Sequence, residues 1–185
     1  MRRALAAEPD HALAHFVRGD VNRARKRFDA AIADYEAAVA LDRNLASAHA
    51  QLGQVKILVG RSPETFAHVE QAMRLSPRDP AMGVWLFFVC HANSHLARDD
   101  ATVETCNRAV AVNPFWIAYT DLAAAHAWQG RTEEAAAALA ELERLMPGYT
   151  AQKFATADWS DHPVFLAEYA RILEGLRRAG LRESS

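Results

Sequence analysis

Residues 27–42 read RFDAAIADYEAAVALD, and this stretch decides the fold. Its small and apolar side chains recur three and four positions apart, at Ala31, Tyr35, Ala38 and Leu41. That spacing places them along one side of an α-helix. A helix with one apolar side is stable only when another element covers that side, so the stretch predicts packed helices.

The same pattern recurs along the chain. A shift of 34 residues carries Gly19 onto Gly53 and Ala38 onto Ala72, and Ala109 continues the series. Prolines end the successive copies at Pro9, Pro77, Pro114 and Pro147, and only Arg43 interrupts this series. A single helix pair cannot bury its apolar stripe, so we expect neighbouring pairs to stack.

These residues resemble tetratricopeptide repeats, in which two antiparallel helices form a unit of about 34 residues. The resemblance implies an all-α fold: a right-handed α-solenoid of helix hairpins with a C-terminal capping helix. We expect four repeats within residues 10–147, at about residues 12–45, 46–79, 80–115 and 116–148. The chain departs from the pattern in copies three and four, where Cys90 and Ala123 take the glycine position.

The two ends differ from the repeats. Residues 1–9 read like the end of a preceding repeat helix, and residues 149–181 are expected to form capping helices. The last of these should run from Val164 to Ala179 and stop at Gly180, with one side on the final repeat and the other in water. We expect residues 182–185 to be a disordered tail.

A second resemblance concerns this C-terminal part. Residues 173–181, LEGLRRAGL, together with the helix around residues 85–88, WLFF, are similar to the C-terminal repeat region of bacterial class III adenylate/guanylate cyclases. This resemblance implies a regulatory module of a bacterial signalling enzyme that acts through self-association or intramolecular contact. The sequence itself contains no counterpart of a cyclase catalytic domain.

Composition and charge exclude several classes of protein. Hydrophobic residues make up 51% of the 185 residues and charged residues 24%, and the formal net charge is −2. The acids Asp20, Asp29 and Asp34 dilute a basic cluster, so we predict no nucleic-acid partner. The basic cluster consists of Arg18, Arg23, Arg25, Lys26 and Arg27. The longest apolar run, residues 81–90, is half as long as a membrane-spanning helix, so we predict no membrane insertion.

The sequence carries no motif of an active site, and we predict no enzyme and no cofactor. His91 and His95 are four residues apart and could share a metal on one side of a helix. Ala92 stands where a zinc protease would need a glutamate, so we interpret the pair as polar surface and expect no metal. Cys90 and Cys106 are interpreted as buried, reduced thiols of a cytoplasmic protein.

The function then depends on the concave surface that the tetratricopeptide resemblance implies. There the first helix of each hairpin would present side chains to a protein or peptide partner of unknown identity, with self-association left open. We therefore predict a non-enzymatic scaffold. The candidate partner-binding residues are Phe16, Asp20, Arg23, Gln51, Gln54, Leu58, Phe87, His91, Ser94, His95, Thr120, Asp121 and Trp128.

Overall fold

The computed structural model describes residues 11–184, and every regular element within that range is a helix. The all-α prediction is therefore confirmed. The chain divides after Asp79 into two compact units, called unit 1 and unit 2 here. The predicted helix end at residues 1–9 lies outside the described residues.

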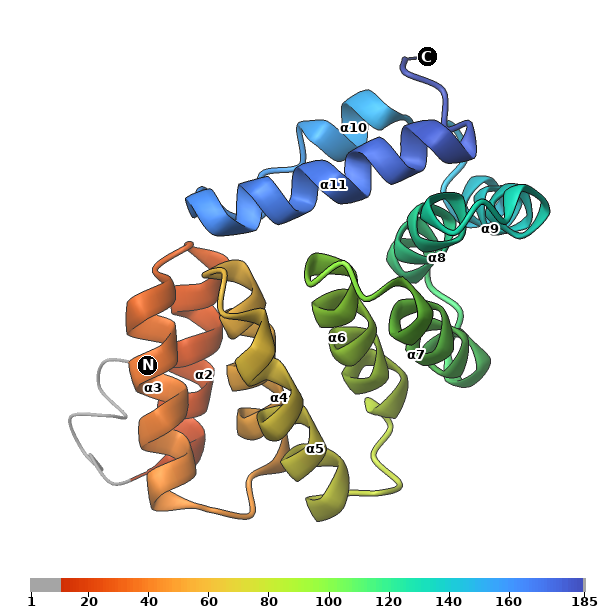
Figure 1. Ribbon diagram of the computed structural model, residues 1–185. Coiled ribbons are helices and arrows are strands. Elements are labelled where there is room, and N and C mark those ends of the chain that lie inside the picture. Colours follow the sequence, from red (N-terminus) through yellow and green to blue (C-terminus); the bar gives the residue numbers. More distant parts are fainter. Residues whose placement is uncertain (1–10, 185) are drawn as a thin grey trace. The chain divides into compact units, whose positions relative to one another are not determined.

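Unit 1 contains two antiparallel helix pairs (Figure 1). Helices α2 (Ala12–Ala24) and α3 (Phe28–Leu41) form the first pair. Helix α4 (Ala46–Leu58), the short 3-10 helix η1 (Ser62–Glu64) and α5 (Thr65–Leu75) form the second. The core contains Phe28, Ala31, Ile32, Tyr35, Leu52 and Val55, so the stripe at Ala31 and Tyr35 is buried as its spacing predicts.

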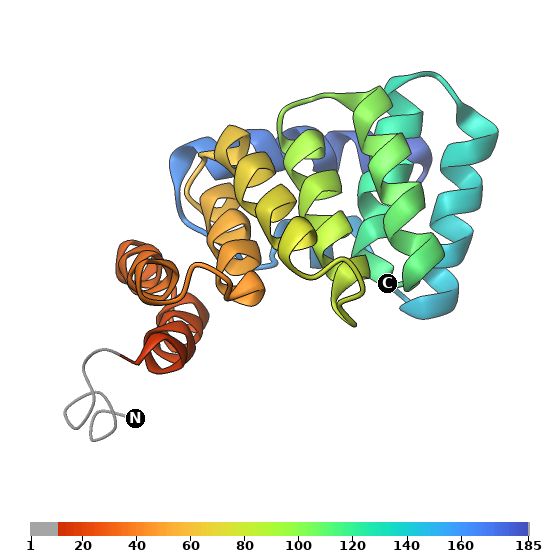
Figure 2. The ribbon, with the colours of Figure 1, turned by 90° about the horizontal axis from the view of Figure 1, so that it is seen from below.

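Unit 2 contains two further pairs and two terminal helices. The pairs are α6 (Met82–His95) with α7 (Asp99–Val112), and α8 (Trp116–Trp128) with α9 (Thr132–Leu145). The terminal helices are α10 (Ala151–Ala155) and α11 (Pro163–Ala179). Figure 2 shows α6 to α9 side by side, in green to teal, with α11 running across them behind.

The turn inside each helix pair has the same backbone geometry. Lys26, Gly60, Ala97 and Gly130 have φ values of 55, 66, 56 and 72°. In each turn the N–H of this residue donates to the carbonyl three residues earlier, and the next N–H donates to the carbonyl five residues earlier. This left-handed closure satisfies carbonyls at the helix end, and its recurrence shows that the sequence repeat is also a structural repeat.

The glycine position of the repeat is a place of close helix approach. A Cβ atom on Gly19 would lie 2.6 Å from the Tyr35 ring, well inside van der Waals contact. Gly53 is similarly close to Val69, at 2.7 Å. Glycine is needed at both positions because no larger residue fits between the paired helices.

The C-terminal helix packs mainly on α8 and also contacts α6 and α9. Its buried residues Phe165, Tyr169, Ile172 and Leu176 lie on one side, as predicted for a capping helix, whereas Leu166 is exposed. The chain beyond it differs from the expected tail at residues 182–185. The carbonyls of Arg182 and Glu183 accept hydrogen bonds from the backbone of Ala151 and Gln152, which ties this segment to α10.

Candidate functional site

The candidate binding residues divide between the two units. Six of them lie on α2 and α4 and form what we call the first-helix face of unit 1: Phe16, Asp20, Arg23, Gln51, Gln54 and Leu58. The other seven lie on α6 and α8 in unit 2. The two sets have different surroundings.

All six residues of the unit 1 face are half-buried. Phe16 and Leu58 pack against the core, and their rings and methyl groups form the edges of the face. Asp20 accepts a hydrogen bond of 2.8 Å from the Tyr35 hydroxyl and lies 4.0 Å from the Arg23 guanidinium. The face therefore combines apolar side chains with a carboxylate that is held in place.

Three polar atoms of this face have unmet bonding capacity. Arg23 Nε, Gln51 Oε1 and Gln54 Oε1 are buried and have no hydrogen-bond partner within residues 11–184. Buried polar atoms without partners are uncommon in folded proteins, and each costs free energy until a partner is found. Because these atoms are buried, a ligand could bond to them only after the three side chains turn outward.

A second polar cluster lies at the other side of α2, and sequence reasoning missed it. The Asp34 carboxylate is buried on α3 and accepts hydrogen bonds from Arg18 Nε at 2.7 Å and from Asn22 at 2.8 Å. The hydrogen bond to Asp34 raises the pKa of the Arg18 guanidinium. These bonds join α2 to α3, which is a structural role that accounts for part of the basic cluster.

Unit 1 also contains a cavity of about 480 Å³ that the prediction did not include. It lies among α3, α4 and α5 and is lined by Glu36, Val39, Ala40, Arg43, His49, Leu52, His68 and Gln71. Most of these residues belong to second helices. The candidate binding residues were all predicted on first helices, so this cavity was not predicted.

In unit 2 the candidate residues are mostly buried. Phe87, Ser94, His95, Thr120 and Asp121 are each less than 9% exposed, and His91 and Trp128 are half-buried. Helix α11 supplies much of this burial, since it packs on the same two first helices that carry these residues. The face that was predicted to hold a partner thus holds a helix of the chain itself.

Specific polar contacts fix α11 on α8 and α7. The Trp128 indole N–H donates to the Arg171 carbonyl at 3.2 Å. The guanidinium groups of Arg171 and Arg178 lie 4.6 and 3.8 Å from the centre of the same indole ring. Arg171 also donates two hydrogen bonds to the Asp99 carboxylate, at 3.0 and 2.8 Å, a bidentate pair of the stronger kind.

A continuous polar chain runs from α8 through α6 to α11. His91 Nδ1 lies 2.8 Å from Asp121 Oδ2, and His91 Nε2 lies 3.2 Å from His95 Nε2. His95 Nδ1 in turn lies 3.0 Å from Glu168 Oε2. Burial lowers the pKa of His95, and the neighbouring His91 acts in the same direction.

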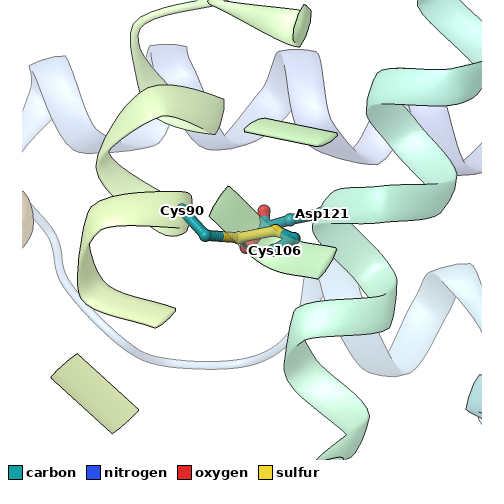
Figure 3. A group of neighbouring side chains, drawn as sticks. All are labelled: Cys90, Cys106 and Asp121. Carbon is teal, nitrogen blue, oxygen red and sulfur yellow. Dashed lines mark hydrogen bonds between the residues drawn. A yellow bond between two sulfur atoms is a disulfide. The ribbon is translucent and has the colours of Figure 1, made fainter. Parts of the chain in front are cut away.

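The prediction of two reduced thiols is wrong in this structure, because Cys90 and Cys106 form a disulfide between α6 and α7. Their Cα atoms are 5.0 Å apart, and Cys90 takes the position that Gly19 and Gly53 have in the first two copies. Figure 3 shows the Asp121 carboxylate of α8 lying against the bridge. All three residues are fully buried.

Comparison with known proteins supports the repeat assignment. Residues 19–60 match the family model described as TPR repeat. A search of curated proteins by sequence finds no match. Within the described residues no helix is both long and apolar enough to cross a membrane.

Solved structures of similar fold cover nearly the whole chain. PilW, a type IV pilus biogenesis factor, has a TM-score of 0.75 at 18% identity, covering 95% of this chain and 86% of its own. YrrB, described as a TPR protein with an unusual peptide-binding site, has a TM-score of 0.65 at 21% identity, covering 96% and 89%. Pseudomonas aeruginosa PilF has a TM-score of 0.73 at 16% identity, covering 97% and 78%.

The fold is therefore that of tetratricopeptide-repeat proteins, as the resemblance implied, and such repeats are protein-interaction scaffolds. The resemblance to the cyclase repeat region receives no support from these proteins and stays a prediction.

Proposed function

We propose that this chain is a non-enzymatic binding module that holds a segment of another protein on the first-helix face of unit 1. The observation that carries the proposal is the set of unpartnered polar atoms at Arg23, Gln51 and Gln54. The same two helices carry Phe16 and Leu58, two partly buried apolar side chains that pack against the core. A surface with an aromatic side chain, an aliphatic side chain and hydrogen-bonding groups suits a peptide. The peptide's side chains can contact the apolar groups, and its backbone amides can bond to the polar ones.

The packing of α11 in unit 2 supports the choice of the first-helix face as the binding surface. There α11 contacts the two first helices through a buried apolar side and a few directed polar bonds. First helices of this chain therefore accept an amphipathic helix when one is available. In unit 1 the equivalent residues of α2 and α4 are only half-buried, which leaves surface for a segment of a partner.

The partner is a protein or peptide, and the face has the chemistry to bind it without catalysis. Asp20 and Arg23 already interact with each other and with Tyr35, so the charged groups are held in place before a ligand arrives. Groups that are preorganised in this way contribute their contacts without a large ordering cost. We further infer that the module does not bind nucleic acid, in keeping with its formal net charge of −2.

The cytoplasmic location stays a prediction. The disulfide between Cys90 and Cys106 does not favour it, since stable disulfides are typical of oxidising compartments.

The experiment that tests this function is selection of peptides from a random display library on the immobilised chain. Selected peptides are then measured by fluorescence polarisation against the Gln51→Ala/Gln54→Ala double variant. Gln152→Ala, an exposed glutamine of α10, is the matched control. We expect at least a tenfold loss of affinity for the double variant and no change for the control. Peptides that bind both variants equally well would show that the partner uses another surface.

A further inference from the structure

The buried side chains around Asp121 form a cluster that peptide binding does not use. Ligand atoms of Cys90, Cys106 and Asp121 all lie within 4.8 Å of one another. Asp121 Oδ2 is 4.0 Å from Cys90 Sγ and 2.8 Å from His91 Nδ1. Three helices, α6, α7 and α8, thus bring two sulfur atoms and one carboxylate to a single buried place (Figure 3).

Asp121 has an unmet bonding requirement at this place. Its side chain is 0% exposed, and its Oδ1 atom has no hydrogen-bond partner among the described residues. A buried carboxylate needs either donors or a cation, because its desolvation is costly. The disulfide beside it offers no hydrogen-bond donor. Asp121 is therefore the side chain of this cluster whose hydrogen-bonding capacity is incompletely satisfied.

We propose that, once the disulfide is reduced, Cys90, Cys106 and Asp121 bind one thiophilic divalent cation, for which Zn²⁺ is the best chemical match, with a water molecule as the fourth ligand. Two thiolates and one carboxylate are ligands of types that Zn²⁺ takes, and three protein ligands with one water molecule make a tetrahedral site. Softer thiolates disfavour Mg²⁺ and Ca²⁺, which prefer oxygen ligands only. The proposal is independent of the function proposed for unit 1.

The side chains beyond the three ligands hold the carboxylate in place. His91 Nδ1 lies 2.8 Å from Asp121 Oδ2, which leaves Asp121 Oδ1 for the cation. His91 Nε2 lies 3.2 Å from His95 Nε2, and His95 Nδ1 lies 3.0 Å from Glu168. A ligating carboxylate whose other oxygen is held by a hydrogen bond is typical of protein metal sites.

The conversion of the disulfide form into the cation-bound form needs one external reductant, a dithiol. The dithiol supplies two electrons, its own sulfurs become a disulfide, and the Cys90–Cys106 bond is broken to give two thiols. Cation binding then releases both thiol protons, and the two thiolates and Asp121 Oδ1 form three bonds to the cation, while a water molecule already bound to the cation keeps the fourth position. Ligand atoms around Zn²⁺ are roughly 3.3–3.8 Å apart in a tetrahedron. Rotation of the two cysteine side chains about their Cα–Cβ bonds can provide this separation.

The test uses the full chain in its oxidised and reduced forms. Protein reduced with a dithiol is desalted without oxygen, incubated with Zn²⁺, desalted again, and its metal content is measured by inductively coupled plasma mass spectrometry. We expect one Zn²⁺ per reduced chain and none per oxidised chain. Co²⁺ in place of Zn²⁺ should give intense visible bands of a tetrahedral ion and a near-ultraviolet thiolate charge-transfer band.

Two variants separate this site from surface binding. Asp121→Asn keeps the size of the side chain and should weaken Zn²⁺ affinity at least tenfold, whereas Asp29→Asn, an exposed acid of unit 1, should not. Circular dichroism verifies that both variants are folded. Stoichiometric Zn²⁺ on the oxidised chain, a Co²⁺ spectrum without the thiolate band, or an Asp121→Asn affinity equal to that of the unchanged chain would each overturn the proposal.

Discussion

The contact between α11 and α8 depends on one residue without a side chain, Gly175. A Cβ atom at this position would lie 2.8 Å from Ala124 Cβ, 2.8 Å from Trp128 Nε1 and 2.9 Å from Ala124 Cα. Carbon atoms are at their best separation about 3.5–4.0 Å apart. Ala124 has no rotatable side chain and cannot move out of the way, so a larger residue must push the two helices apart by about 1 Å.

We therefore expect Gly175→Val to destabilise unit 2. Forcing extra carbon atoms into a packed interface costs about 1–3 kcal/mol. Valine is only a few tenths of a kcal/mol better than glycine in a helix, so little of this cost is recovered. The expected loss in the free energy of unfolding is about 2 kcal/mol, and the damage should be concentrated where α11 lies on α8.

The assay combines urea unfolding, followed by circular dichroism, with hydrogen exchange of the α11 amides. Ala170→Val is the matched control, because Ala170 lies on the exposed side of the same helix and receives the same side chain. We expect faster exchange of α11 amides in Gly175→Val only. Equal stability and equal exchange in the two variants would mean that α11 does not approach α8 at Gly175, and the description of unit 2 would be wrong.

Three further predictions concern local features. Ala97→Gly should stabilise the chain by about 0.5–1 kcal/mol in urea unfolding, because Ala97 adopts a positive φ that costs glycine nothing, and Gly130→Ala should destabilise it. Tyr35→Phe should lower the unfolding free energy by about 1 kcal/mol, since Asp20 loses a hydrogen bond, and a variant of unchanged stability would refute that bond's contribution. Burial lowers the pKa of His68 in the folded chain, so protonation favours the unfolded chain; stability should fall as the pH drops below about 6.5, and His68→Asn should reduce this slope.

The sequence was sufficient for the helix pairs because each pair satisfies several local rules at once. Glycine at Gly19 and Gly53 allows close approach, alanine recurs at Ala38 and Ala72 on the second helix, and proline follows the second helix in most copies. These requirements involve residues fewer than about 40 positions apart, so they are visible as a period. The repeat divisions themselves remain a proposal, to which the shared turn geometry at Lys26 and Gly60 lends support.

The position of α11 was harder to predict. Its amphipathic pattern indicates that Phe165 and Tyr169 are buried, but a pattern does not say which neighbour buries them. In the structure His95 contacts Glu168, which is 73 residues away in the sequence, and the Phe165 ring. Contacts of that separation leave no period in one sequence, which is why the unit 2 candidates were interpreted as open surface.

The cysteines show the same limit at shorter range. The spacing of Cys90 and Cys106 placed them on the two helices of one pair, and their burial was expected. Whether two such sulfurs bond depends on an interhelix distance, which the spacing in the sequence does not give. In the structure the two Cα atoms are 5.0 Å apart, a separation that a disulfide can span. The Asp121 carboxylate comes from the next helix pair, so no local pattern could have shown that it lies beside the two sulfur atoms.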